Sequence, residues 1–215
     1  MDEILNIRKP IRIIRAGEIK QYYSMQKAID AMERAFSSLS SGESLVPLRF
    51  VSMLPSNELL MLFKSAYVEK DKRVTVKILT QRESGFTQGI PTIQGIVLVI
   101  DADTGEILSI MDGEYLTALR TGAASGLATR CFARKDAQTM SLFGCGSQGR
   151  TQLEAVVCER DIKKVFVFDK NIDSADLFIS EMQEKLNLEI VYAEDTSVLK
   201  ETDIICTATN STTPL

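Results

Sequence analysis

The stretch LFGCGSQG at residues 142–149 decides the fold of this chain. It has the G-x-G-x-x-G spacing, with a β-prone run before it and a helical pattern after it. The glycines of the motif are Gly144, Gly146 and Gly149. The first allows a tight turn, the second allows backbone to approach a pyrophosphate, and the third allows helix and strand to pack closely. The helix N-terminus offers free N–H groups to the phosphates.

A second β-prone run, residues 165–168, leads to Asp169, about 20 residues after the last glycine. A carboxylate at this point accepts hydrogen bonds from both hydroxyls of an adenine ribose. It favours NAD over NADP because it would repel a 2′-phosphate, but Lys170 and Asn171 follow directly and keep NADP possible. The order of these elements predicts a dinucleotide-binding domain, and a glycine-rich loop within another α/β domain is the alternative.

Composition narrows the class of protein. The 215 residues are 45% hydrophobic and 25% charged, as in ordinary globular proteins. The net charge of −4, without a basic block, argues against nucleic acid as a partner. No apolar run reaches the roughly 18–20 residues of a membrane span. The first residues lack the apolar core of a signal peptide, so we expect a cytoplasmic protein.

The chain contains no histidine, which removes the commonest general base and the commonest zinc ligand. We therefore expect no metal site, and we assign any acid–base chemistry to other residue types. Its cysteines lie outside C-x-x-C pairs in apolar or helical segments, which predicts buried, reduced thiols. They are Cys131, Cys145, Cys158 and Cys206.

Hydrophobic periodicity predicts a helix followed by a sheet in the first half of the chain. Residues 24–40 have the pattern of an amphipathic helix that Ser24 caps and Gly42 ends. A mixed or antiparallel sheet is expected after it, with turns at residues 89–92 and 101–105. Its expected strands are residues 46–53, 58–68, 73–80, 92–100 and 106–111.

The second half begins with a helical pattern at residues 114–132, rich in Ala, Gly and Thr, which suits close packing against another backbone. Strands alternating with helices then predict a parallel, doubly wound sheet. The expected strands are residues 139–143, 164–168, 189–193 and 203–208. Because a complete dinucleotide fold has about six strands, we expect a truncated Rossmann-type domain.

The predicted fold class is therefore α/β, with a mixed or antiparallel sheet in the N-terminal domain and a truncated Rossmann-type domain after it. We expect a substrate-binding and dimerisation domain at residues 1–118. We expect an incomplete dinucleotide-binding domain at residues 119–215.

Several cations are candidates for binding an anionic ligand: Arg49, Lys64, Lys77 and Arg120. A solvated surface cation is the default interpretation of each, and for Lys64 that interpretation stays as good as any other. Lys77 lies in an alternating strand, where desolvation can lower the pKa of a lysine so that it acts as an acid or base. Arginine suits bidentate carboxylate binding. Arg49, Lys77 and Arg120 thus predict one pocket for an anion.

Several motifs of the chain together carry a family resemblance. These motifs are, in chain order, Lys77, GIPT at 89–92, DTG at 103–105, LTALRTGAA at 116–124 and G-x-G-x-Q at 144–148. With them the chain resembles the ornithine cyclodeaminase/mu-crystallin family. The resemblance spans about residues 25–214. It departs from the family at Gly149, where alanine is usual, and this change leaves tight packing possible.

The resemblance implies NAD(P)-dependent hydride transfer at the α-carbon of an amino acid. We expect an ornithine cyclodeaminase, which converts L-ornithine to L-proline and ammonia. The alternatives are an alanine dehydrogenase, a cyclic-imine reductase acting on a ketimine or pyrroline-2-carboxylate, and a non-catalytic, nucleotide-binding protein like mu-crystallin. The family's catalytic aspartate lies further along than Leu215, so we expect this chain to lack it.

The resemblance also implies roles for individual residues. Lys77 would be catalytic and would hold the substrate carboxylate with Arg49 and Arg120, while Thr92 would line the pocket. The residues expected to bind the cofactor are Thr121, Gly144, Gly146, Ser147, Gln148, Gly149, Asp169, Thr207 and Thr209. Glu58 is a candidate acceptor for the second ammonium of ornithine, although a solvated strand-edge carboxylate is commoner.

The first domain also predicts a partner. A small mixed sheet with one long helix must bury its second face somewhere, and in the family that face forms a homodimer. We therefore expect a homodimer whose substrate is a small amino acid or cyclic imine, without nucleic acid or membrane partners.

Overall fold

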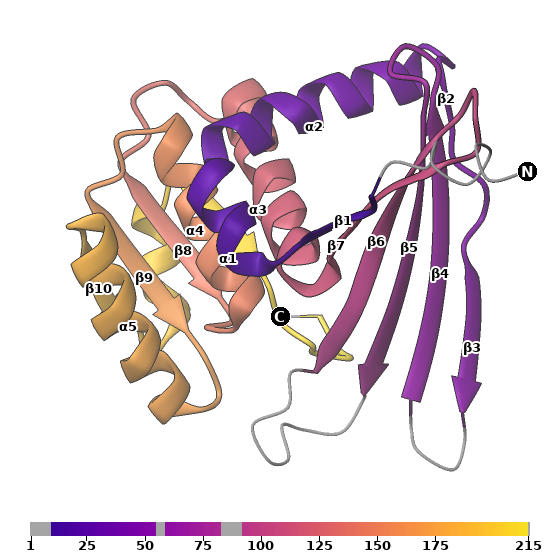
Figure 1. Cartoon of the computed structure of the whole chain (residues 1–215). Coiled ribbons are helices and arrows are strands. Elements are labelled where there is room, and N and C mark those ends of the chain that lie inside the picture. Colours follow the sequence, from indigo (N-terminus) through magenta and orange to yellow (C-terminus); the bar gives the residue numbers. More distant parts are fainter. Residues whose placement is uncertain (1–9, 55–58, 83–91, 215) are drawn as a thin grey trace, which may run out of the picture. The chain divides into compact units, whose positions relative to one another are not determined.

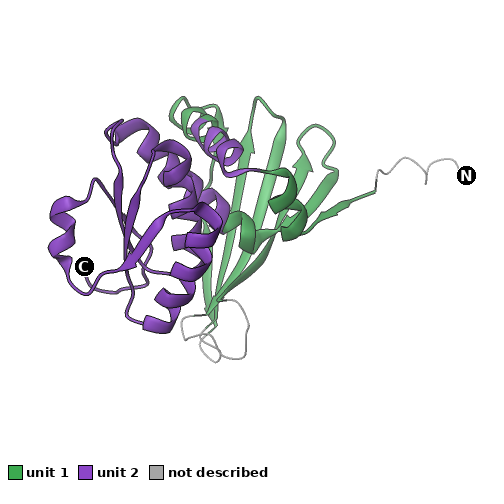
Figure 2. Ribbon diagram, turned by 90° about the vertical axis from the view of Figure 1, so that its left-hand side faces the viewer, with its two compact units in different colours: residues 1–23, 34–117 green, residues 24–33, 118–215 purple. Residues whose placement is uncertain are grey.

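A computed structural model describes residues 10–54, 59–82 and 92–214 of the chain. The chain divides into two compact units (Figure 2). Unit 1 comprises residues 1–23 and 34–117, and unit 2 comprises residues 24–33 and 118–215. Each unit is built around its own sheet (Figure 1).

The sheet of unit 1 has seven strands in the order β1-β7-β6-β5-β4-β2, and β3 also pairs with β4. The pair of β1 and β7 is parallel and the others are antiparallel, so the predicted mixed sheet is confirmed. Its strands are β1 (Arg12–Ile14), β2 (Ser44–Leu45), β3 (Phe50–Leu54), β4 (Leu59–Val68), β5 (Arg73–Arg82), β6 (Ile93–Asp101) and β7 (Ile107–Asp112).

The register of this sheet divides its side chains between two faces, because neighbours along a strand alternate. Lys77 of β5 pairs with Lys64 of β4 on one side and with Val97 of β6 on the other, so these three share one face. The opposite face is mostly apolar, with exposed side chains such as Phe50 and Ile96 and a few polar positions such as Thr80. Its members include Ile13, Phe50, Met61, Phe63, Val76, Ile78, Ile96 and Leu98.

Three helices belong wholly or partly to unit 1: α1 (Ala16–Tyr22), α2 (Met25–Ser40) and α3 (Gly113–Phe132). Ser24 caps α2 as predicted, since its Oγ accepts a hydrogen bond from the N–H of Lys27 at 3.3 Å. Gly42 ends this segment with a φ of 78°, a conformation that glycine adopts without steric cost. None of the helices in the described part of the chain is long and apolar enough to cross a membrane.

Unit 2 contains a parallel sheet in the order β10-β9-β8-β11. This is the arrangement of one half of a doubly wound dinucleotide fold together with the strand across its switch point. Its elements are β8 (Thr139–Phe143), α4 (Ser147–Glu159), β9 (Lys164–Phe168), α5 (Ile172–Leu186), β10 (Glu189–Tyr192), the 3₁₀ helix η2 (Thr196–Glu201) and β11 (Ile204–Thr207).

A dry core holds this second sheet to its helices. Apolar side chains of the strands pack against those of α4 and α5, and none of them has any exposed area. They are Met140, Leu142, Val165 and Val167 of the strands, Leu153 and Val156 of α4, and Phe178 and Met182 of α5. Burial of this much apolar surface is the main favourable term in folding of the unit.

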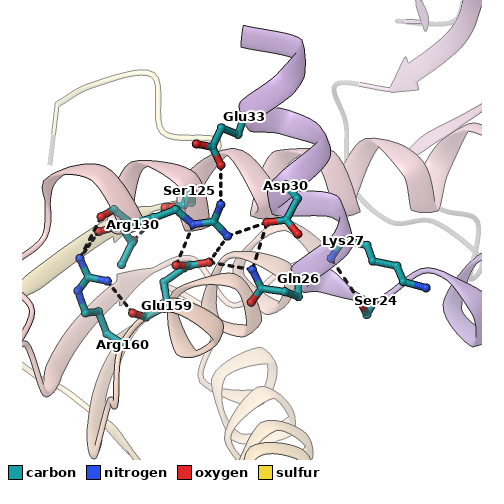
Figure 3. Close-up of polar contacts among 10 residues, drawn as sticks. Ser24, Gln26, Lys27, Asp30, Glu33, Ser125, Arg130, Glu159 and Arg160 are labelled. Carbon is teal, nitrogen blue, oxygen red and sulfur yellow. Dashed lines mark hydrogen bonds and ion pairs between the residues drawn. The ribbon is translucent and has the colours of Figure 1, made fainter. Parts of the chain in front are cut away.

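Arg130 ties three segments of unit 2 together (Figure 3). Its guanidinium donates to Asp30 and Glu33 of α2 at 2.9 and 2.7 Å, and to Glu159 of α4 at 2.8 and 3.1 Å. Gln26 donates to Asp30 and Glu159 from α2. A charge-assisted network of this kind fixes the start of α2 on α3 and α4 within the unit.

Arg160 closes the end of α3. Only 6% of its surface is exposed, and it donates to the carbonyl oxygens of Thr129, Ala133 and Arg134, each at 2.7 Å. The last carbonyls of a helix have no intrahelical partner and carry partial negative charge. A buried guanidinium satisfies several of them at once, so Arg160 is a structural cap.

Four sequence-based expectations differ from the structure. The strand predicted at residues 46–53 begins only at Phe50, where β3 starts, and residues 46–49 lie outside any strand; Pro47 among them lacks an N–H for the ladder. The short elements β1 and α1 were not predicted, since three and seven residues carry too little periodicity. The connection before β11 contains η2 rather than an α-helix.

The fourth difference concerns the thiols. All four cysteines are free, but Cys131 and Cys158 are exposed rather than buried. They occupy the outward sides of α3 and α4, where the local sequence is apolar although the tertiary position is not.

Candidate functional site

The glycine motif forms a tight turn between β8 and α4. Gly144 has a φ of 101°, and a Cβ there would lie 2.4 Å from the carbonyl oxygen of Ala208. A Cβ on Gly149 would lie 2.2 Å from the carbonyl oxygen of Gly144, whereas one on Gly146 would meet no atom within 4 Å. The two outer glycines thus serve the close packing of the chain, and the middle one leaves open space at the start of α4.

That open space lies at the amino end of a helix. Gly146 is the N-cap of α4 and provides no side-chain cap, while Ser147 and Gln148 form its first turn. The unpaired N–H groups of such a turn attract an anion. The Oε1 atom of Gln148 is buried without a hydrogen-bond partner, so a bound N–H or O–H group would satisfy it.

Asp169 lies where β9 ends and its carboxylate faces the glycine turn. Its Oδ2 accepts the N–H of Cys145 at 2.7 Å, and its Oδ1 accepts the N–H of Asn171 at 2.9 Å. Each carboxylate oxygen can accept a further bond, so hydroxyl donors of a ribose can still be held. Desolvation and the Asp169 charge raise the pKa of the Cys145 thiol to about 12, which keeps a thiolate away from the phosphate position.

The segment after β11 returns to the same turn. Ala208 donates its N–H to the carbonyl of Phe143 at 2.7 Å, which sets Thr207–Thr209 beside the end of β8. Thr207 and Thr209 are exposed. The carboxyl ends of β8 and β11 are the switch point of the parallel sheet, where ligands bind in open α/β folds. The residues present therefore fit a dinucleotide.

In unit 1, Lys77 is the best positioned of the predicted site residues. It lies at the middle of β5, half-buried, and its Nζ donates to the Oγ1 of Thr117 at 3.4 Å. That hydroxyl in turn donates to the carbonyl of Gly113 at 2.6 Å, so its lone pairs face the ammonium. Thr117 has a contact to Lys77 that sequence analysis missed, although it belongs to the LTALRT run, because only tertiary structure brings β5 and α3 together.

Arg49 and Lys64 extend the row of Lys77 across the sheet. Lys64 pairs directly with Lys77. Arg49 immediately precedes Phe50, whose register partner Phe63 immediately precedes Lys64. Arg49 is exposed and lies outside the bounds of β3. Three cations thus follow one line over neighbouring strands.

Thr92 lies apart from that line within the sheet. Its carbonyl accepts the N–H of Arg82 at 3.1 Å at the start of β6. It is five positions before Val97, the register partner of Lys77, or about 17 Å along an extended strand. Within unit 1 the structure therefore does not make Thr92 and Lys77 neighbours. The predicted turn before it, residues 89–91, and Glu58 lie outside the described residues.

Arg120 and Thr121 belong to α3 in unit 2. Arg120 is an exposed residue, yet desolvation of its guanidinium lowers its pKa from the ordinary value, and arginine keeps its charge all the same. Gly122 follows them at a close helix crossing, since a Cβ there would lie 2.3 Å from the carbonyl of Thr151. The small residues of α3 serve this approach to α4.

No group of three or more acidic or thiol side chains in the described residues is arranged to hold a metal ion. The parallel sheet, the glycine turn at its switch point and the acid that ends β9 define an α/β protein with a Rossmann-type dinucleotide-binding unit.

Comparison with known proteins assigns the family. The profile of the ornithine cyclodeaminase/mu-crystallin family matches residues 12–215, and the chain belongs to this family. The chain is 33% identical over 204 residues to a Δ1-pyrroline-2-carboxylate reductase of Bacillus cereus, covering 94% of this chain and 63% of the relative.

Solved structures of other proteins have the same fold over most of this chain. The Δ1-pyrroline-2-carboxylate reductase of Thermococcus litoralis, in complex with NADH and L-proline, matches with a TM-score of 0.88 and 35% identity over 92% of this chain and 61% of the other. An archaeal alanine dehydrogenase dimer with bound NAD matches with a TM-score of 0.83 and 26% identity over 93% and 60%. The chain thus spans somewhat under two thirds of the length of these relatives.

Proposed function

We propose that the protein is an NAD(H)-dependent oxidoreductase of small α-amino acids and their imines, and that it reduces a cyclic imine such as Δ1-pyrroline-2-carboxylate. The observation that carries the proposal is the glycine turn packed against Ala208 at the switch point of the parallel sheet. Membership of the family and the 33–35% identity to two pyrroline-2-carboxylate reductases support the substrate class.

The residues that would hold NAD lie around the glycine turn. The N–H groups at the start of α4, with Ser147 and Gln148, would bind the pyrophosphate, and Asp169 would accept the ribose hydroxyls. Thr121, Thr207 and Thr209 complete the proposed set. When bound, the nicotinamide supplies or accepts a hydride at the α-carbon of the substrate. The carboxylate of Asp169 favours NAD, and NADP remains the alternative.

The cations would position the substrate. Arg49, Lys77 and Arg120 are proposed to bind its carboxylate, with Thr92 as a lining residue, since guanidinium and ammonium groups pair well with carboxylates. In imine reduction a hydride adds to the carbon of the C=N bond and a proton adds to its nitrogen. Lys77, oriented by Thr117, is proposed to be the catalytic residue that supplies this proton.

Ornithine cyclodeaminase activity, which gives the family part of its name, is the second candidate. It uses the same hydride transfer, followed by attack of the δ-amine of ornithine on the imine and loss of ammonia. Formation of proline and ammonia from L-ornithine with NAD distinguishes it from imine reduction. A third candidate is a non-catalytic nucleotide binder, which would bind NADH without turning over any amino acid or cyclic imine.

We also propose that residues 1–215 do not include the catalytic aspartate of the family. The four residues proposed to bind substrate, Arg49, Lys77, Thr92 and Arg120, include no carboxylate. On this proposal, residues 1–215 alone bind NADH but turn over substrate slowly. Measuring NADH binding and imine reduction on the same sample tests it, and rapid turnover would contradict it.

We propose a homodimer formed through the apolar face of the first sheet. Ile13 and Phe50 on this face are 68% and 64% exposed, and contiguous exposed apolar surface marks an interaction site. The related archaeal alanine dehydrogenase is a dimer. We also propose a cytoplasmic location, which the four free thiols support, since thiols stay reduced in that compartment.

Titration with NADH, followed by assay of pyrroline-2-carboxylate reduction, tests the proposed function. We expect nicotinamide fluorescence to change on binding, and Lys77→Met to lower kcat/KM by about 100-fold or more while the Kd for NADH stays within twofold. Thr117→Val should lower kcat/KM by about tenfold, because it only removes the group that orients Lys77. Lys70→Met, at an exposed turn, is the control. Absence of NADH binding would contradict the proposal.

A further inference from the structure

Arg150 reaches back from the first turn of α4 to the glycine turn. Its backbone N–H donates to the carbonyl oxygen of Gly146 at 3.2 Å, which closes the first turn of the helix. Its side chain reaches one residue further back, where its Nη1 donates to the carbonyl oxygen of Cys145 at 2.5 Å. Cys145 lies between Gly144 and Gly146, so Arg150 holds the backbone of the glycine motif itself.

The guanidinium of Arg150 is in turn held by α5. Its Nε donates to Glu181 at 2.8 Å, and its Cζ lies 5.2 Å from the centroid of the Phe178 ring. Phe178 is fully buried, and the Arg150 side chain is only 22% exposed. Because the donors of a guanidinium lie in one rigid plane, bonds at Nε and Nη1 together with the ring fix its orientation. Arg150 is therefore a rigid support for Cys145.

The backbone of Cys145 is held on both sides. Asp169 accepts its N–H at 2.7 Å, while Arg150 donates to its carbonyl oxygen. The peptide bond from Cys145 to Gly146 is trans, so its C=O and its N–H point in opposite directions. The N–H of Gly146 therefore points away from Arg150, and as the N-cap of α4 it has no intrahelical acceptor. A 180° rotation of this peptide plane would replace that N–H by a carbonyl oxygen, whose partial negative charge repels an anion.

We propose that Arg150 is a positioning residue for the cofactor: by holding the Cys145 carbonyl on its own side, it presents the N–H of Gly146 to the pyrophosphate of NADH. The inference rests on the proposed function, in which the start of α4 binds the pyrophosphate. Arg150 acts through Cys145 and not by contact with the cofactor. Its loss lowers the fraction of molecules whose turn is ready to bind, and the apparent affinity falls in proportion to that fraction.

Two measurements on Arg150→Met test this inference. NMR relaxation dispersion on the cofactor-free protein should show microsecond-to-millisecond exchange at the Gly146 amide in the variant and none in the wild type. The Kd for NADH, followed by nicotinamide fluorescence, should rise about tenfold or more, as expected for the loss of a hydrogen bond from a charged group.

Lys185→Met is the matched control. Lys185 of α5 pairs with Glu154 of α4 at 2.5 Å, so it joins the same two helices one turn further along each of them than the pair of Arg150 and Glu181. This control should leave the Gly146 amide without exchange and the Kd for NADH within twofold. Glu181→Met is a milder variant, which keeps the bond from Arg150 to the turn and serves if Arg150→Met does not fold. It should raise the Kd about two- to fivefold.

The outcomes separate the inference from the proposed function. A Gly146 amide without exchange in Arg150→Met would overturn the inference, because the turn would keep its orientation without Arg150. An equal loss of NADH affinity in Lys185→Met would overturn it as well, because the docking of α5 on α4 would then be the cause. If the wild type does not bind NADH, the proposed function is contradicted, while the exchange measurement, which needs no cofactor, still decides whether Arg150 fixes the turn.

Discussion

The two sheets of this protein differ in how far their side chains are buried. In the parallel sheet of unit 2, the three central residues of β8 and of β9 are all buried, and α4 and α5 supply a core with no exposed area. In the sheet of unit 1, Leu79 and Ser109 are the buried residues among the described strand positions, and large apolar side chains such as Ile13 and Phe50 stay exposed.

The difference bears on the homodimer proposed above. A parallel sheet covered on both faces has continuous apolar runs in its strands, as β9 does. An antiparallel sheet can leave one face uncovered, but then that face is normally polar. The second face of unit 1 is mostly apolar instead, so we expect its stability to depend on association and that of unit 2 to depend on its own contacts.

The largest expected effect is at the glycine turn. Gly144→Ala should destabilise unit 2 by about 3 kcal/mol, because a Cβ would meet the carbonyl of Ala208 and the positive φ is strained for alanine. Gly146→Ala should leave stability unchanged, since its Cβ meets no atom within 4 Å, yet weaken NADH binding about tenfold or more. Urea denaturation and NADH titration measure the pair. Equal destabilisation by both changes would contradict the assigned roles.

The second-largest expected effect is at Arg160, the buried cap of α3. Arg160→Leu should cost unit 2 about 2–3 kcal/mol, because it leaves buried carbonyls at the end of α3 without donors. Arg130→Met is the comparison, and its cost should be about 1 kcal/mol because Asp30 and Glu33 are about half-exposed and can be solvated. Thermal unfolding with two probes ranks them. A larger effect for Arg130 would show that the ion-pair network, not the cap, holds α3.

The apolar face of unit 1 provides the third test. Phe50→Lys should weaken the proposed dimer by about 2 kcal/mol, which is roughly a 30-fold rise in its Kd. Phe132→Lys changes a ring that is 88% exposed on α3 and serves as the control. Sedimentation equilibrium gives the Kd directly. An unchanged dimer in Phe50→Lys, or an equal loss in Phe132→Lys, would argue against this face as the interface.

The smallest expected effect is the loss of stability at acidic pH when Asp203 is protonated. Backbone N–H groups of Gln138 and Thr139 hold the pKa of Asp203 at about 2, below its ordinary value of 3.8. A carboxyl with a depressed pKa stabilises the fold fully above about pH 4, and this stabilisation is lost as the pH falls toward 2. Asp203→Asn should therefore flatten the loss of stability between these values. Denaturation at several pH values measures it, with Asp161→Asn as the exposed control; identical slopes would contradict the assignment.

The sequence by itself predicted most of this architecture. The G-x-G-x-x-G turn, the acid that ends β9 and the apolar runs of β8 and β9 are local signals, and each specifies its element within about 30 residues. The alternating run around Lys77 likewise predicted a strand. The strand expected at 46–53 starts late, at Phe50, because Pro47 interrupts an otherwise β-prone run, and β1 and α1 were missed because short elements depend on tertiary pairing.

Only the tertiary structure decided the contacts between residues that lie far apart in the sequence. Strand register sets Lys64 against Lys77, and no local pattern distinguishes this register from one shifted by two residues, which keeps the same faces. Packing likewise brings Thr117 to Lys77 and Arg160 to the end of α3. Local chemistry determined which elements form, while the burial of whole faces determined which side chains meet.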